Sequence, residues 1–120
     1  MHRSLILFCF VLFLGFVGQA GAHPPSEIEL TYDAQGEMLE VRMTHVVRNP
    51  RDHYIRKVEL TKNSGEPRDF YFPAQVSPHE FKEKIPLKAE PGDEITIKAF
   101  CNKAGTAEAV LTIPYEKNLK

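Results

Sequence analysis

Five side chains that bind transition metals in other proteins lie in residues 23–120 of this chain: His23, His45, His53, His79 and Cys101. Imidazole nitrogen and thiolate sulfur together suit iron, zinc or copper, because these ions favour donors of intermediate softness. Cys101 is the only cysteine in this stretch, so an internal disulfide there is excluded. The sequence leaves two interpretations of Cys101: a buried thiol that packs as a small apolar side chain, or a metal ligand.

The first 22 residues have the pattern of a signal peptide. A basic start at His2 and Arg3 precedes an apolar run over residues 5–17, and small residues occupy positions 20–22. A run of roughly 13 residues is shorter than the about 20 that a membrane-spanning helix needs. We predict cleavage after Ala22, which makes residues 1–22 a signal peptide and residues 23–120 one periplasmic or secreted domain without membrane attachment.

Charge and composition exclude one class of partner. The chain carries 15 basic and 16 acidic residues, a formal net charge of −1, with no basic stripe and no interleaving of basic and aromatic residues. Nucleic acid is therefore not expected as a partner. The sequence sets no oligomeric state.

Short alternating segments separated by turn residues predict an all-β fold, an Ig-like antiparallel sandwich of about seven strands. The expected strands cover residues 27–33, 38–46, 53–62, 68–72, 80–88, 94–101 and 106–113. The third of these breaks strict alternation, because Ile55 would point away from Val58 and Leu60. A bulge or burial on both faces would explain this, and the sequence leaves both open.

The strand pattern also predicts where the candidate ligands lie. The apolar row that begins at Leu39 ends at His45, and the row that begins at Ile95 ends at Cys101. In a sandwich of antiparallel neighbours each connection reverses the chain. His53 then begins its strand at the end of the sandwich where those two rows finish. We expect all five candidate ligands at this one end.

Three of these residues stand in an order known from an iron-binding family. His45, Pro50 and His53-Tyr54-Ile55, followed much later by Cys101-Asn102-x-x-Gly105, resemble the iron domain of the superoxide reductases (neelaredoxin and the second domain of desulfoferrodoxin). The resemblance implies an Ig-like sandwich and a mononuclear non-haem iron held by four equatorial histidines and one axial cysteine, with the sixth position open to superoxide.

By the same resemblance, His45 and His53 are equatorial ligands and Cys101 is the axial one, whereas His23, followed by two prolines, matches the family's first histidine more loosely. Ala104 stands where the family has a further histidine, the interval from His45 to His53 is two residues longer, and the charged Glu-Lys pair before the first histidine is missing. The resemblance thus implies a superoxide reductase-like oxidoreductase with an altered iron site, in which His79 or water replaces a ligand, and an electron-donor protein as its partner.

Two other interpretations stay open. His23, as the first residue of the mature chain, would offer its α-amino group and its imidazole to copper, with His45 or His53 completing a three-nitrogen site. Alternatively, the domain is a metal-free Ig-like binding or structural module. The fold is also similar to the small sandwich subunit of the thiosulfate-oxidising carrier complex, which shares a comparable histidine stretch without being an iron enzyme, so the scaffold alone implies no chemistry.

Overall fold

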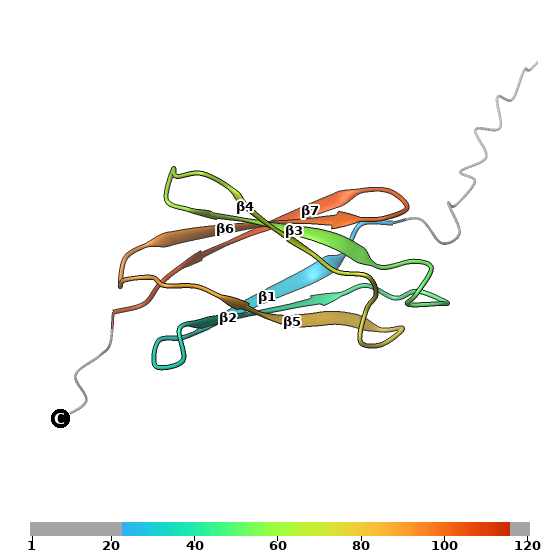
Figure 1. Ribbon diagram of the computed structural model, residues 1–120, viewed down its shortest axis with the longest axis horizontal. Helices are drawn as coiled ribbons and strands as arrows, with labels where there is room; N and C mark the ends of the chain where they lie inside the picture. The colour runs from blue at the N-terminus through green and yellow to red at the C-terminus, as the bar shows by residue number, and fades with distance from the viewer. Residues whose placement is uncertain (1–22, 116–120) are drawn as a thin grey trace, which may run out of the picture.

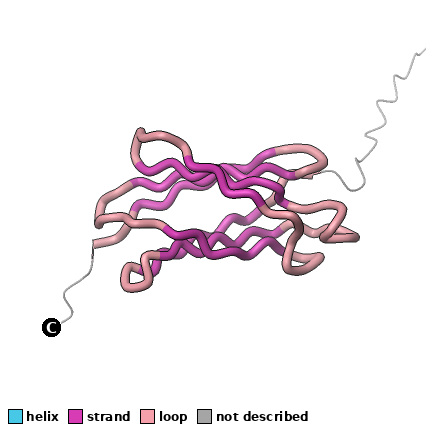
Figure 2. Tube along the Cα trace, viewed as in Figure 1, coloured by secondary structure: helices cyan, strands magenta, loops and turns pink. Residues whose placement is uncertain are grey.

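The computed structural model describes residues 23–115 (Figure 1), and the predicted signal peptide, residues 1–22, lies outside the described residues. Seven strands and their connecting loops make up the described part of the chain, which contains no helix (Figure 2). The strands are β1 (Ser26–Asp33), β2 (Met38–Thr44), β3 (Ile55–Lys62), β4 (Arg68–Tyr71), β5 (Glu80–Pro86), β6 (Glu94–Cys101) and β7 (Thr106–Thr112). Each expected strand is present, and its ends differ from the prediction by no more than two residues.

The strands form two antiparallel sheets that pack face to face as the two layers of Figure 1. One sheet has the order β1-β2-β5 and the other has the order β4-β3-β6-β7. Successive side chains of a strand point to opposite faces, so each strand contributes every second residue to the space between the sheets. The predicted all-β, Ig-like sandwich is confirmed.

The core between the sheets consists of aliphatic side chains and one phenylalanine. Its members are at most 1% exposed: Leu39, Val41, Met43, Ile55, Val58, Leu60, Phe81, Ile85, Ile95, Ile97 and Ala99. The rows that these residues form on β2 and β6 run to the end of the sandwich where His45 and Cys101 lie. At this end of the sandwich, the core is therefore closed by His45 and Cys101 rather than by further aliphatic side chains.

A β-bulge in β3 explains the broken alternation of that strand. Ile55 pairs with Cys101 of β6, but the next pair joins Lys57 to Phe100, so Arg56 is an extra residue without a partner. Because one residue is added, Ile55 and Val58 both point into the core. Of the two explanations that the sequence leaves open, the bulge is correct.

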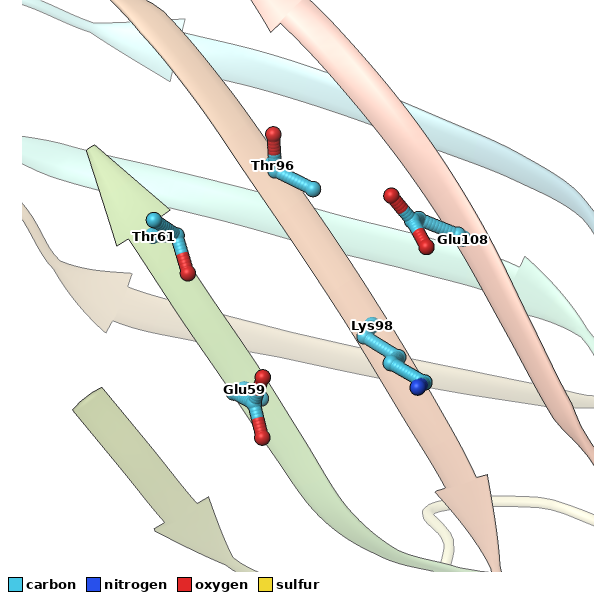
Figure 3. A pocket seen from close by; sticks show the side chains of 5 residues that line it. All are labelled: Glu59, Thr61, Thr96, Lys98 and Glu108. Atoms are coloured by element: carbon cyan, nitrogen blue, oxygen red, sulfur yellow. The ribbon is translucent and has the colours of Figure 1, made fainter. Parts of the chain in front are cut away.

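The outer face of the four-stranded sheet carries a cluster of charged and hydroxyl side chains. Figure 3 shows the side chains of Glu59, Thr61, Thr96, Lys98 and Glu108 around a shallow pocket on this face. Lys98 lies between Glu59 and Glu108 in the register of the three strands.

In residues 23–115 no helix is long and apolar enough to cross a membrane.

Truncation of a core side chain tests this assignment. Ile97→Ala on β6 should lower the free energy of unfolding by about 2–5 kcal/mol, because it removes buried apolar contacts and leaves a cavity. Urea denaturation followed by circular dichroism measures the loss. Val110→Ala on β7, where the side chain is 56% exposed, is the control and should change stability by less than about 0.5 kcal/mol. Equal losses in the two variants would contradict the assigned core.

Candidate metal centre

Three of the sequence-predicted ligands converge at one end of the sandwich. His45 directly follows β2, His53 lies two residues before β3, and Cys101 ends β6. One ligand atom from each of the three lies within 4.8 Å of the others, and all three residues are buried. The predicted convergence is thus confirmed, whereas the role of these residues as metal ligands stays a prediction.

The pairing of β3 with β6 brings His53 to the sulfur of Cys101. Cys101 lies opposite Ile55, and the chain just before Ile55 carries His53 to the same end. The Nε2 atom of His53 is 3.0 Å from Sγ of Cys101, and each residue is 6% exposed. A nitrogen and a sulfur bound at right angles to one ion, at about 2.1 and 2.3 Å from it, would lie about 3.1 Å apart. The two side chains therefore already have the spacing of adjacent ligands.

Asn102 ties the loop of His53 to the end of β6. Its Oδ1 accepts a hydrogen bond from the main-chain N–H of Tyr54 at 2.8 Å, and its Nδ2 donates to the carbonyl of Asp52 at 2.8 Å. Its own N–H donates to the carbonyl of Tyr54 at 2.9 Å. Both neighbours of His53 are thus bound to the residue that follows Cys101. This is the physical link between the His-Tyr and Cys-Asn parts of the sequence motif.

Gln75 is a site residue that the sequence analysis missed. It lies in the loop between β4 and β5, is 7% exposed, and contacts Nδ1 of His45 through its Oε1 atom. A single glutamine in a loop that contains prolines follows no periodic pattern and no known spacing. No sequence signal was available to find it.

His79 supports the site through its main chain. Its carbonyl accepts a hydrogen bond from the N–H of His45 at 3.1 Å, and the carbonyl of Pro78 accepts one from Val47 at 2.7 Å. The side chain of His79 is exposed and is not among the three residues whose ligand atoms converge. His79 therefore lies at the expected end of the sandwich, but its imidazole is not where a replacement ligand would have to be.

His23 reaches the cluster through its ring. Its centroid is 5.0 Å from that of His45 and 5.6 Å from that of His53, in edge-on contacts. Both ring nitrogens face main-chain carbonyls, Nε2 that of Val46 at 2.9 Å and Nδ1 that of Pro24 at 3.1 Å. One of these contacts would have to break before His23 could bind a metal. Its assignment as a ligand stays a prediction.

Gly105 allows the segment with His23 to pass close to the turn after Cys101. Its φ angle is +89°, a conformation that side chains disfavour, and a Cβ atom there would lie 3.0 Å from three atoms of Pro24. The carbonyl of Gly105 also accepts a hydrogen bond from the N–H of Cys101 at 3.1 Å. Ala104, at the position where the sequence resemblance implies a histidine, is exposed in the same turn.

The environment of His53 favours its neutral form. Burial lowers the pKa of His53 below its ordinary value, and the neighbouring imidazoles of His45 and His23 lower it further through charge repulsion. A neutral imidazole has a free lone pair, which metal binding requires. The site therefore offers His53 as a ligand without the cost of first removing a proton near neutral pH.

Comparison with known proteins gives structural neighbours only. No protein-family model matches the chain, and no curated protein matches its sequence significantly. The solved structure of the superoxide reductase (neelaredoxin) from Ignicoccus hospitalis is 22% identical, with a TM-score of 0.48 over 84% of this chain and 87% of that one. A variant of that protein gives a TM-score of 0.50 at 22% identity, over 84% and 86%. The superoxide reductase from Nanoarchaeum equitans is 18% identical, with a TM-score of 0.41 over 76% and 92%.

At 22% identity, the match to the Ignicoccus variant shows a shared overall fold. The chain is similar to a superoxide reductase in its architecture. The fold that the sequence resemblance implied is therefore present.

The lowered pKa of His53 predicts how the stability of the metal-free protein depends on pH. As the pH falls, His53 takes up a proton at a higher pH in the unfolded chain, where its pKa is near 6.5, than in the folded protein. The stabilisation linked to His53 is fully present above about pH 6.5 and is lost as the pH falls through the pKa of the folded state. Urea denaturation at pH 7.5, 6.5 and 5.5 should show a steeper loss of stability in the wild type than in His53→Gln. Parallel losses in the two proteins would contradict this assignment.

Removal of the Asn102 side chain tests the link between the two parts of the site. Asn102→Ala should lower the free energy of unfolding by about 1–3 kcal/mol, because it removes two hydrogen bonds, to the part-buried N–H of Tyr54 and to the carbonyl of Asp52, and each contributes about 0.5–1.5 kcal/mol. Urea denaturation measures this. Lys103→Ala at the next position removes only a surface ion pair with Asp52 and should cost no more than about 1 kcal/mol. A larger loss in the Lys103 variant than in the Asn102 variant would refute the assigned role.

Proposed function

We propose that this chain is a divergent, exported member of the superoxide reductase family that binds one mononuclear non-haem iron ion. The observation that carries the proposal is the convergence of His45, His53 and Cys101 at one end of a sandwich with the fold of a superoxide reductase. The order of these residues along the chain agrees with the family motif. The localisation that goes with this proposal is the periplasm or the exterior of the cell.

The residues present fit such an ion. His45 and His53 supply imidazole nitrogens, Cys101 supplies a thiolate, and His23 is the next imidazole in reach. Nε2 of His53 and Sγ of Cys101, 3.0 Å apart, are spaced as adjacent ligands would be. Each of the three converging residues is also buried, which keeps competing water away from the donor atoms.

An iron ion bound here would supply one-electron redox chemistry, tuned by the thiolate. The protein's part is to hold the donors in the correct protonation state. Cys101 must lose its proton to bind, so metal affinity should fall as the pH decreases. His53 is favoured in its neutral form by burial and by the neighbouring imidazoles.

Ala104 makes the proposed site an altered one. Its methyl side chain offers no donor, so the protein contributes fewer imidazoles than the family normally does. The resulting centre has an additional position open to water or to a small anion. We include in the proposal a superoxide reductase-like one-electron activity, in which an electron-donor protein supplies the electron.

Copper is the second candidate, and one observation favours it. The converging donor set is two histidines and one cysteine, and a main-chain oxygen, that of His23, lies 3.1 Å from Nε2 of His45. Two imidazoles and a thiolate with a weak axial oxygen form the donor set of electron-transfer copper sites. This candidate uses Cys101, unlike a copper site built on the α-amino group of His23.

Substitution of the sulfur tests the proposal. The purified protein comprising residues 23–120, given ferrous iron without oxygen and then oxidised, should bind one iron per chain. It should then show a thiolate-to-ferric charge-transfer band. Cys101→Ser should abolish the band, because the hydroxyl group cannot replace the thiolate in that transition. Metal analysis and visible absorption measure both quantities. His79→Ala is the control. It should keep both the iron and the band, because the exposed imidazole is not one of the three converging side chains and the main-chain carbonyl that bonds to His45 is retained.

Other outcomes separate the alternatives. Absence of stoichiometric iron in the wild type would sink the iron proposal. If copper instead gives an intense band that Cys101→Ser removes, the second candidate is correct. Copper binding that survives Cys101→Ser, but not the addition of one residue before His23, would support the site at the α-amino group.

A further inference from the structure

The buried amide of Gln75 makes a complete set of hydrogen bonds around His45. Its Nε2 donates to the carbonyl of His45 at 3.1 Å and to the carbonyl of Ser77 at 3.2 Å. Its Oε1 accepts from the N–H of Ile55 at 3.2 Å and contacts Nδ1 of His45. The N–H of Gln75 itself donates to the carbonyl of Pro50 at 3.0 Å. The side chain of Gln75 therefore joins three segments of the site: the residue after β2, the start of β3 and the loop before β5.

These contacts fix which way the amide points. The two carbonyls that face Nε2 are acceptors only, so the amino group must lie on their side. The N–H of Ile55 is a donor only, so it requires the amide oxygen. An amide turned the other way would place two acceptors, or two donors, against each other in a buried position, which strongly disfavours that orientation.

The orientation of Gln75 determines how His45 carries its protons. Because the amide oxygen is an acceptor, the contact with Nδ1 of His45 is a hydrogen bond only if Nδ1 carries a proton. A protonated nitrogen has no lone pair for a metal. Nδ1 is then closed to a metal. His45 can bind an ion only through Nε2, which must first give up any proton that it donates to the carbonyl of His23, 3.1 Å away.

We propose that Gln75 is a positioning residue that holds the proton on Nδ1 of His45 and thereby presents Nε2 as the metal-binding atom. The inference deepens the proposed function and rests on it for the use of that atom. Nε2 of His45 lies 3.1 Å from the carbonyl oxygen of His23. A metal that binds Nε2 must therefore either displace this carbonyl or share it as a further oxygen ligand.

The same amide fixes the position of His45 relative to the strand that carries His53. It bonds both the ring and the main chain of His45, and through Ile55 it bonds the first residue of β3. Hydrogen-bond partners of this kind, behind a metal-binding histidine, typically contribute about 10–100-fold to metal affinity. Loss of Gln75 should therefore reduce binding even if the fold survives.

The first experiment needs neither a metal nor a variant. Long-range ¹H–¹⁵N correlation spectra of the metal-free protein report which imidazole nitrogens carry protons. We expect a proton on Nδ1 of His45, whether or not Nε2 is also protonated. A spectrum in which the proton of His45 is on Nε2 alone overturns the inference.

The second experiment measures Zn²⁺ affinity, because zinc is redox-inactive and accepts the same nitrogen and sulfur donors. Gln75→Met keeps the size of the side chain but removes the amide, and it should weaken binding by about 10–100-fold. Gln75→Glu restores the oxygen that accepts from Nδ1 and should bind more tightly than the methionine variant. Gln35→Met, in the exposed turn between β1 and β2, is the control and should bind as the wild type does.

The outcomes separate this inference from the proposed function. Wild-type affinity in both Gln75 variants overturns the positioning role. Equal weakening in the methionine and glutamate variants does so too, since a merely structural role would not distinguish them. If the wild type binds neither iron nor zinc, the proposed function fails, while the proton position on His45 still decides the inference. If a Gln75 variant does not fold, the spectra of the wild type still test the inference.

Discussion

The geometry of this site depends on the register of β3 against β6. Ile55 lies opposite Cys101, and the bulge at Arg56 allows Ile55 to point inward together with Val58. If the pairing slipped by one residue, the side chains of one strand would exchange faces, and the sulfur would leave the core side of the sheet. The contact between Nε2 of His53 and Sγ of Cys101 is therefore a consequence of strand pairing more than of the loops.

A core that ends in imidazole and thiol groups needs partners for them. Buried polar groups cost free energy unless they are hydrogen-bonded, and among the described residues every buried side-chain nitrogen and oxygen has a partner. Two amide side chains supply many of these bonds. Gln75 does so from the loop before β5, and Asn102 does so from the turn after β6. The loops thus stabilise positions that the sheets have already brought close together, and they restrict the orientation of each ring.

Much of this arrangement follows from the sequence, for a physical reason. Alternation along a strand identifies its buried face, and each antiparallel connection reverses the chain, so the ends of the rows at His45 and Cys101 could be assigned to one end of the sandwich. Other features depend on individual contacts that have no period. The choice between a bulge and burial on both faces at Ile55 needed the partner strand, and the part played by Gln75 needed the loop conformation. For the same reason, only the structure shows that the nitrogens of His23 face main-chain carbonyls.

The turn that contains Ala104 clarifies what the missing histidine would change. This turn is held by main-chain and amide bonds: Cys101 bonds to Gly105, Asn102 bonds to the segment around His53, and Gly105 lies against Pro24. None of these contacts involves the side chain at position 104, which is exposed. A change from histidine to alanine there removes a donor without moving the sulfur or the other imidazoles. In the proposed iron site, the difference from the superoxide reductase pattern would therefore lie in the number of ligands, and not in the position of the three donors that converge.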